Sequence, residues 1–208
     1  MQSIYLDHAA TSFPKPPAVG ARMQEYVDRI GASVNRGSYA AAQQAGLTVL
    51  QLRQRLCELF DFRSVPHVVL TPGNTWGLNL LLFGALRPGD HCLVSAVEHN
   101  AVMRPLVQLA HRGVTFDRIP CDSTGRLLVE WIEPLLRDNT RLVLLTHASN
   151  VSGALNDVQE VGKMCHRYEI PFALDAAQTA GHVPIDFAAL GLSALSVPGH
   201  KGLLGPQG

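Results

Sequence analysis

One lysine near the end of the chain, Lys201, has surroundings that suit covalent chemistry. It lies in the glycine-rich turn Gly199-His200-Lys201-Gly202, directly after a short apolar run at 194–197. An amine held at the mouth of a strand can form a Schiff base with an aldehyde cofactor, provided that the site lowers its pKa. A lysine taken alone is most often a solvated surface charge. The interpretation therefore depends on residues elsewhere in the chain.

An acidic residue, Asp175, directly follows a second apolar run at 170–174. Parallel sheets place ligand-binding groups at the carboxyl ends of such buried strands. A carboxylate there would keep the ring nitrogen of pyridoxal phosphate protonated, and Gln178 is close enough to reach the ring's phenolic oxygen. An Asp in this position is, on its own, more often a turn or a helix cap. Together with the turn around Lys201, it predicts a pyridoxal phosphate site.

The turn at 71–75, Thr-Pro-Gly-Asn-Thr, is the best anion-binding candidate in the sequence. Gly73 lets the backbone approach a ligand closely, and the free amides that begin the following helix favour a phosphate, with the Thr75 hydroxyl adding a hydrogen bond. An ordinary capped helix is the alternative. The turn matches neither the Walker A pattern nor GxGxxG, so a nucleotide is poorly supported.

Two more polar residues follow predicted strands. His99 offers an imidazole that can stack on a flat ring or handle a proton, and Asn150 can hydrogen-bond the cofactor's phenolic oxygen. Surface polarity for the histidine and turn chemistry for the asparagine are the ordinary explanations. All of these candidates fall at the carboxyl ends of strands in one predicted sheet, where a doubly wound fold gathers its site. Their convergence indicates a single site.

The pattern of apolar residues predicts the elements that position these side chains. From residue 67 onward, short apolar runs alternate with amphipathic segments, which is typical of a parallel α/β sheet. Upstream we expect a strand-like entry at 4–6, an amphipathic helix over 19–30 that stops at Gly31, and a long helix over 39–60. The expected strands are 68–71, 92–96, 115–119, 142–146, 172–175 and 194–197, and the expected helices are 75–86, 101–112, 129–137 and 158–168.

The composition excludes several classes of protein. Lys and Arg number 17, as do Asp and Glu, so the net charge is zero and nothing indicates binding to nucleic acid or to an anionic membrane. No signal peptide and no apolar run of about 18 residues is present, so we expect a soluble cytoplasmic protein. The four cysteines lack metal-ligand spacing. We predict no metal site, with Cys57 and Cys92 in the core and Cys121 and Cys165 more exposed.

Seven motifs spread over nearly the whole sequence form an ordered set. They are YLDHAATS at 5–12, VNRGS at 34–38, TPGNTWGLN at 71–79, VEHNAV at 97–102, THASNVSG at 146–153, LDAAQTAG at 174–181 and GHKGLLGP at 199–206. In this order they resemble the class V aminotransferase family, of the cysteine desulfurase and selenocysteine lyase type. The resemblance implies the large domain of a fold-type I pyridoxal phosphate-dependent transferase, an α/β fold with a mostly parallel sheet and helices on both faces.

The resemblance also implies a role for each candidate residue. Lys201 would carry the internal aldimine, Asp175 would pair with the pyridine nitrogen, and His99 would stack over the ring, so that Lys201 and His99 are the catalytic pair. The other implied positions are Gly73, Asn74, Thr75 and His200 around the phosphate, Asn150 and Gln178 at the phenolic oxygen, and Ala9, Ala10, Asn35 and Arg36 near the substrate.

The activity implied by the resemblance is that of a cysteine desulfurase. Such an enzyme moves sulfur from L-cysteine to an enzyme persulfide and releases alanine; it is a homodimer and can pass the sulfur to an acceptor protein. Selenocysteine lyase chemistry and another class V reaction, such as transamination or epimerisation, stay open. A non-catalytic scaffold that only binds pyridoxal phosphate is the alternative of a different class, although such a scaffold has no need of Lys201.

The sequence departs from the family pattern in three places. It stops seven residues after Lys201, whereas family members carry the nucleophilic cysteine and an arginine for the substrate carboxylate well beyond this lysine. We therefore expect an amino-terminal fragment without turnover and with impaired stability: an arm with helices at 1–66, an incomplete large domain at 67–208, and no small carboxy-terminal domain. Pro198 replaces a serine common in relatives, which removes one phosphate contact. The turn around Lys201 is also one residue longer than the commoner form, which suggests a divergent branch.

Overall fold

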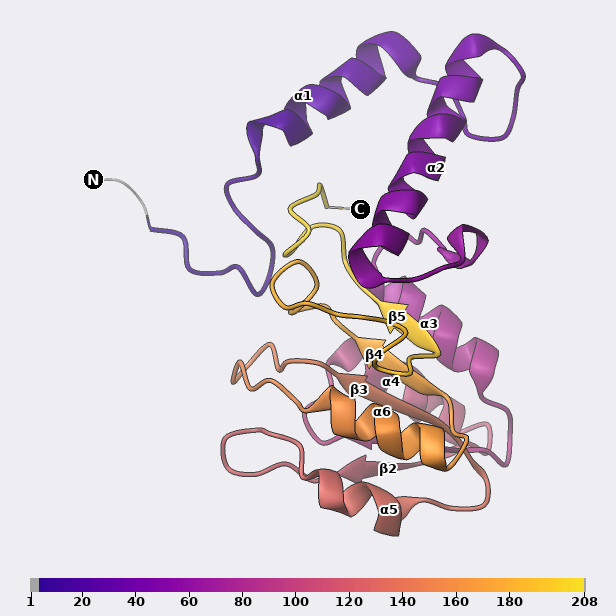
Figure 1. The fold of residues 1–208 in the computed structure, drawn as a ribbon, viewed down its shortest axis with the longest axis vertical. Coiled ribbons are helices and arrows are strands. Elements are labelled where there is room, and N and C mark those ends of the chain that lie inside the picture. The colour runs from indigo at the N-terminus through magenta and orange to yellow at the C-terminus, as the bar shows by residue number, and fades with distance from the viewer. Residues whose placement is uncertain (1–3, 208) are drawn as a thin grey trace.

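The computed structural model describes residues 4–207, and its centre is a five-stranded parallel sheet (Figure 1). The strands lie in the order β2-β1-β3-β4-β5, and every neighbouring pair is parallel. Parallel strands need crossover connections, which the intervening helices supply. The strands are β1 (His91–Ser95), β2 (Thr115–Ile119), β3 (Thr140–Thr146), β4 (Phe172–Asp175) and β5 (Ala194–Ser196).

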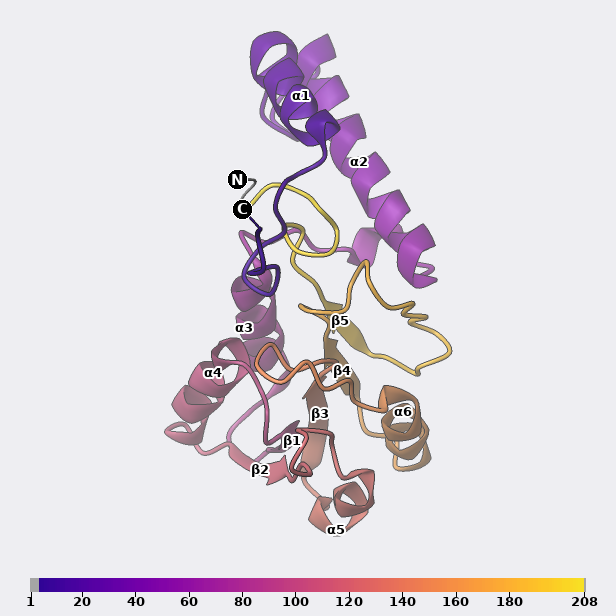
Figure 2. The ribbon, with the colours of Figure 1, turned by 90° about the vertical axis from the view of Figure 1, so that its left-hand side faces the viewer.

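The two faces of the sheet are covered by different helices, as Figure 2 shows. Helices α3 (Asn74–Ala85) and α4 (Asn100–Ala110) lie on one face, and α5 (Ile132–Leu135) and α6 (Val158–Arg167) lie on the other. Alternate strand residues point to opposite faces, and each set joins its own apolar cluster. Cys92, Val94, Leu142, Leu144 and Ala173 pack with α3 and α4, whereas Leu93, Val143, Leu145, Phe172 and Leu174 pack with α5 and α6. Burial on both faces explains why these strands are continuous apolar runs.

The amino-terminal helices project away from the sheet as a helical arm, residues 17–60 (Figure 1). Helix α1 (Pro17–Glu25) continues into one π-helical turn (Tyr26–Ile30), which ends at Gly31 in the left-handed conformation, φ +51°. Helix α2 (Ala40–Phe60) returns toward the sheet. None of these helices, nor any other helix in residues 4–207, is long and apolar enough to cross a membrane.

Most of the predicted elements are present, with small shifts at their ends. The strands at 115–119 and 172–175 match β2 and β4, and the helix expected at 19–30 stops at Gly31 as predicted. The segment expected at 129–137 is a 3-10 turn (Val129–Trp131) followed by the short α5. A second 3-10 turn (Val65–His67) precedes α3.

Three local predictions are wrong. Residues 68–71 are not a strand: the Val68 amide donates to the Val65 carbonyl (3.2 Å), and no neighbouring strand pairs with this segment within residues 4–207. Residues 4–6 also form no strand, and Leu6 is 86% exposed. Cys165 is buried rather than exposed, because it lies one helical turn from Val161 on the inner face of α6. Cys57 and Cys92 are buried and Cys121 is half-buried, as expected.

Candidate functional site

A cavity of about 410 Å³ opens where the sheet meets the beginnings of α3 and α4. Its size is that of a small-molecule site. The carboxyl ends of β3, β4 and β5 and the first residues of both helices contribute to its wall. All nine residues predicted to bind the cofactor line this cavity: Gly73, Asn74, Thr75, His99, Asn150, Asp175, Gln178, His200 and Lys201.

Lys201 is held by close contact between two backbone turns. Gly181 has φ +83°, and a Cβ there would lie only 2.6 Å from the Gly202 carbonyl carbon. A Cβ on Gly202 would in turn clash with the Ala180 carbonyl. Both positions thus need glycine, and their contact fixes the backbone directly after Lys201 relative to the loop that follows β4.

The Lys201 amine is half-buried in the cavity wall. Burial lowers its pKa, and the negative charge of Asp175 opposes this change. A lysine with a lowered pKa carries more of the neutral, nucleophilic amine near neutral pH. The structure therefore gives Lys201 an environment that favours a nucleophilic amine.

Asp175 ends β4 and is 2% exposed. Its Oδ1 accepts hydrogen bonds from Asn74 Nδ2 (2.8 Å) and from the Ala177 amide (3.0 Å). Burial raises the pKa of Asp175, and this rise is opposed in part by these two hydrogen bonds and by the electrostatic effects of His99 and Lys201. The carboxylate thus sits in a dry position where several groups favour its charged form.

The beginning of α3 provides the anion-binding part of the cavity. Gly73 is the N-cap residue, and in the described part of the chain no side chain caps the first amides of the helix. Thr75 also lines the cavity. Uncapped amides at a helix start, with the helix dipole behind them, favour a phosphate. Pro198 also lines the cavity and has no amide hydrogen to donate.

Asn74, one of the residues expected around a phosphate, uses its side chain for contacts within the protein. Its Nδ2 donates to Asp175, and its Oδ1 accepts a hydrogen bond from Ser196 Oγ (2.6 Å). Both ends of the amide are therefore engaged within the protein. Only the backbone amide of Asn74 is left for a phosphate.

His99 is the N-cap residue of α4, and its ring orientation follows from that role. The Nδ1 atom accepts a hydrogen bond from the Ala101 amide (3.1 Å). This bond assigns the ring hydrogen of the neutral form to Nε2. Because His99 also lines the cavity, its imidazole is held at the wall in one defined tautomer.

His200 connects the turn around Lys201 to the amino-terminal segment. Its Nδ1 pairs with Thr11 Oγ1 (3.0 Å), and its pKa is lowered by burial and by the nearby charges of Lys201 and Lys15. Its carbonyl oxygen accepts hydrogen bonds from the Ser12 amide (3.2 Å), from Thr11 Oγ1 (3.0 Å) and from Lys15 Nζ. The sequence analysis did not identify Lys15, because about 185 residues separate it from its partner.

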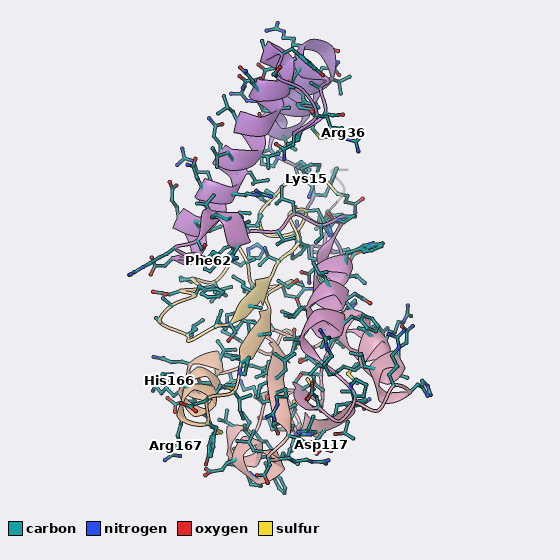
Figure 3. The ribbon with its side chains drawn as sticks, turned by 90° about the vertical axis from the view of Figure 1, so that its right-hand side faces the viewer. Lys15, Arg36, Phe62, Asp117, His166 and Arg167 are labelled. Carbon is teal, nitrogen blue, oxygen red and sulfur yellow. The ribbon has the colours of Figure 1, made fainter. Side chains whose placement is uncertain are left out.

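The four predicted substrate residues do not gather at the cavity. Ala9 comes nearest, since its carbonyl accepts a hydrogen bond from Gln178 Nε2 (3.1 Å). Ala10, Asn35 and Arg36 are outside the cavity wall. Figure 3 shows Arg36 toward the outer end of the helical arm, beyond Lys15. The cause is local: a small apolar cluster of Ala32, Ala42 and Ala45 anchors the 31–39 turn to the arm.

A buried carboxylic acid next to His99 was also missed. Oε1 of Glu98 accepts hydrogen bonds from Ser95 Oγ (2.6 Å) and from the Thr146 amide (2.7 Å), so it joins the ends of β1 and β3. Burial raises the pKa of Glu98 to about 8. The sequence gives no signal of this burial, because the burial of Glu98 depends on how the ends of β1 and β3 pack together.

The comparison with protein families agrees with this site. A family model described as Aminotransferase class-V matches residues 4–208. The chain belongs to this family. Curated relatives include a probable cysteine desulfurase of Methanothermobacter thermautotrophicus, which is 34% identical over 206 residues, and the cysteine desulfurase IscS of Shewanella sp. strain MR-4, which is 34% identical over 211 residues. These alignments cover 99% of this chain but only 51% and 52% of the relatives, so the chain spans about half their length.

Solved structures of the family share the fold. The apo cysteine desulfurase of Thermococcus onnurineus NA1 has a TM-score of 0.91 and 30% identity, with 98% of this chain and 51% of that chain covered. A structure described as SspA in complex with cysteine also has a TM-score of 0.91, at 26% identity over 99% of this chain and 59% of the other. The parallel sheet with helices on both faces is thus the fold-type I transferase fold predicted from the sequence.

Proposed function

We propose that the chain is the cofactor-binding part of a pyridoxal phosphate-dependent cysteine desulfurase, with the cofactor domain in residues 67–208. The observation that carries the proposal is one cavity of about 410 Å³ lined by Lys201, Asp175, His99 and the uncapped start of α3. Relatives at 34% identity that are named cysteine desulfurases support this choice of reaction within the family.

The residues present fit each part of pyridoxal phosphate. The Lys201 amine suits the aldehyde carbon, the Asp175 carboxylate suits the ring nitrogen, and the amides at the start of α3 suit the phosphate. Asn150 and Gln178 are the candidates for the phenolic oxygen. When bound, the cofactor supplies an electron sink that stabilises negative charge on the substrate's α-carbon.

The protein's own groups would bind the substrate and move its protons. The lowered pKa of Lys201 lets this amine accept a proton near the α-carbon and return it. In His99, Nδ1 is occupied by the Ala101 amide, so Nε2 is the ring atom that can exchange a proton. Both side chains line the same cavity, so these transfers need no large movement.

The sulfur-accepting thiol is proposed to come from outside these 208 residues. None of the four cysteines lines the cavity. Burial raises the pKa of Cys92, of Cys121 and, to about 12, of Cys165, which disfavours the reactive thiolate. With an external thiol the reaction balances as L-cysteine plus RSH giving alanine plus RSSH. The same observation favours a second candidate, a class V reaction such as transamination that needs no thiol.

We also propose a homodimer that functions in the cytoplasm. Exposed apolar side chains on and before α3, namely Trp76 (66%), Leu80 (59%) and Val69 (63%), support an interface beside the cavity. The four free cysteines are typical of a reducing compartment. Sedimentation equilibrium at micromolar concentration tests the dimer, and a monomer in the cofactor-loaded form contradicts it. An acceptor protein that takes the sulfur is part of the same proposal.

The first experiment is an absorption titration of the purified chain with pyridoxal phosphate, followed by borohydride reduction and peptide mapping. We expect a visible band and a pyridoxyl group on Lys201, absent from Lys201→Ala but kept in Lys163→Ala, where an exposed lysine is removed. A folded sample without any adduct contradicts the enzyme proposal and leaves the non-catalytic alternative. Product analysis with L-cysteine, on a longer protein that supplies the sulfur-accepting thiol, then separates alanine, expected for a desulfurase, from a 2-oxo acid. L-Selenocysteine as a competing substrate tests the lyase alternative.

A further inference from the structure

Three polar side chains form a continuous chain of hydrogen bonds below the cavity. Ser196 at the end of β5 donates to Asn74 Oδ1 (2.6 Å), and Asn74 Nδ2 donates to Asp175 Oδ1 (2.8 Å). Asn74 is 122 residues from Ser196 and 101 residues from Asp175. The first turn of α3 approaches β5 closely, since a Cβ on Gly77 would lie 3.1 Å from Ser196 Oγ. Tertiary packing therefore places these groups together.

The direction of each bond follows from the chemistry of the partners. A carboxylate only accepts hydrogen bonds, so the amide nitrogen of Asn74 must face Asp175. The amide oxygen then faces Ser196, whose hydroxyl donates to it. The opposite orientation would place the Asn74 oxygen against the carboxylate oxygen with no hydrogen between them. Asp175 thus selects the orientation of the Asn74 amide, and the Ser196 hydroxyl stabilises that orientation by donating to Asn74 Oδ1.

The two oxygens of Asp175 consequently differ. Oδ1 accepts from both Asn74 Nδ2 and the Ala177 amide, whereas Oδ2 accepts no hydrogen bond from any residue in the described part of the chain. The carboxylate lines the cavity and is 2% exposed. Two donors on one oxygen fix the plane of the carboxylate and leave the other oxygen for a ligand.

We propose that Asn74 is a positioning residue that reserves Oδ2 of Asp175 for the ring nitrogen of pyridoxal phosphate, and that Ser196 acts through Asn74. This inference rests on the proposed function and deepens it. The Asn74 side chain then serves Asp175, and its backbone amide is the group left for the phosphate expected there. The Asn74 amide also opposes the effect of burial on Asp175, because a hydrogen bond to the charged form favours that form.

The test compares two ligands that differ only at the ring nitrogen. Dissociation constants of pyridoxal phosphate and of its 1-deaza analogue, in which C–H replaces the ring nitrogen, are measured by absorption titration of the 208-residue chain. The unmodified chain should prefer pyridoxal phosphate. Asn74→Ala should reduce this preference about tenfold, the order expected for one hydrogen bond to a charged group. Asn74→Asp, which places a second carboxylate beside Asp175, should reduce it further.

Variants of Ser196 give a second test of the same inference. Ser196→Ala should reduce the preference less than Asn74→Ala does, and the double variant should equal Asn74→Ala, because Ser196 acts only through the amide. The matched control is Asn79→Ala on the same helix, whose Nδ2 donates to the Thr75 carbonyl (2.7 Å) and not to Asp175. The control should keep the preference of the unmodified chain.

The possible results separate the two proposals. If the unmodified chain binds neither ligand, or binds both equally, the proposed function fails and this inference falls with it. If it prefers pyridoxal phosphate but Asn74→Ala and Asn74→Asp keep that preference, only the inference is overturned. An equal loss of affinity for both ligands also overturns it, since that result indicates a phosphate or packing role. If Asn74→Ala does not fold, the inference is tested with Asn74→Asp and Ser196→Ala. The measured quantity is again the ratio of the dissociation constants of the 1-deaza analogue and pyridoxal phosphate.

Discussion

Replacing Gly181 by alanine should destabilise the protein and disturb Lys201 at the same time. Gly181 has φ +83°, a conformation that costs an L-residue about 1–2 kcal/mol. The new Cβ would also lie 2.6 Å from the Gly202 carbonyl carbon and 3.1 Å from the Leu203 amide nitrogen. Because these are backbone atoms, relief needs a backbone shift, which costs about 1–3 kcal/mol more. We expect a total loss of about 2–5 kcal/mol.

Gly89→Ala is the matched control for this prediction. Gly89 has φ +93°, but no atom lies within 4 Å of its Cβ position, so only the conformational cost applies. Any effect of alanine on the unfolded chain is common to both variants and cancels in the comparison. Urea unfolding followed by circular dichroism gives the two losses, and labelling of Lys201 with pyridoxal phosphate and borohydride gives the local effect. If Gly181→Ala loses no more stability than Gly89→Ala, the close contact between the two turns does not constrain the site.

Three further predictions concern buried and capping side chains. Burial raises the pKa of Glu98 from 4.5 to about 8, so the folded protein keeps a proton that the unfolded chain releases, and stability falls as pH rises from about 4.5 to about 8. Glu98→Gln should remove this dependence of stability on pH and raise the free energy of unfolding at pH 8 by on the order of a few kcal/mol, measured by urea unfolding. An unchanged dependence on pH contradicts this assignment. Burial lowers the pKa of His147, which pairs with Thr179 Oγ1 (2.9 Å). The contribution of neutral His147 to the free energy of unfolding is therefore complete above pH 6.5 and is lost as the pH falls below that value. His147→Gln should flatten the acid side of the stability profile, and a profile identical to that of the unmodified chain refutes the assignment. The Asp157 carboxylate caps α6 through the Glu160 amide (3.3 Å), so Asp157→Ala should cost about 1 kcal/mol in thermal unfolding, and no change in melting temperature rules out the cap.

The sheet could be predicted largely from the sequence because its three inner strands, β1, β3 and β4, are buried on both faces. Runs such as 142–145 and 172–174 are continuously apolar, and such runs mark strands whether or not their partners are known. The segment at 68–71 has the same local signal, yet a strand also needs a neighbour, and the described chain offers none to it. Cys165 was misplaced for a related reason. Its burial depends on which face of α6 meets the sheet, and position near an element's end does not determine that face.

The candidate site was predictable in location but not in the direction of its side chains. Residues at the carboxyl ends of parallel strands share one edge of the sheet, so His99, Asp175 and Lys201 were expected together and do line one cavity. Arg36, which the family resemblance placed near the substrate, lies outside the cavity wall, because its turn packs on the helical arm.

The hydrogen-bond partners of the Asn74 side chain could not be predicted from its neighbours in the sequence. Its neighbours in the sequence, a glycine and a threonine at a helix start, favour a phosphate contact. Its side chain instead bonds Ser196 and Asp175, which are more than a hundred residues away along the chain. An amide has a donor and an acceptor end, so its role is set by the two groups that it faces. The packing of α3 against the ends of β4 and β5 determines those two groups. The same packing determines which oxygen of Asp175 is left for the ring nitrogen that we propose to bind there.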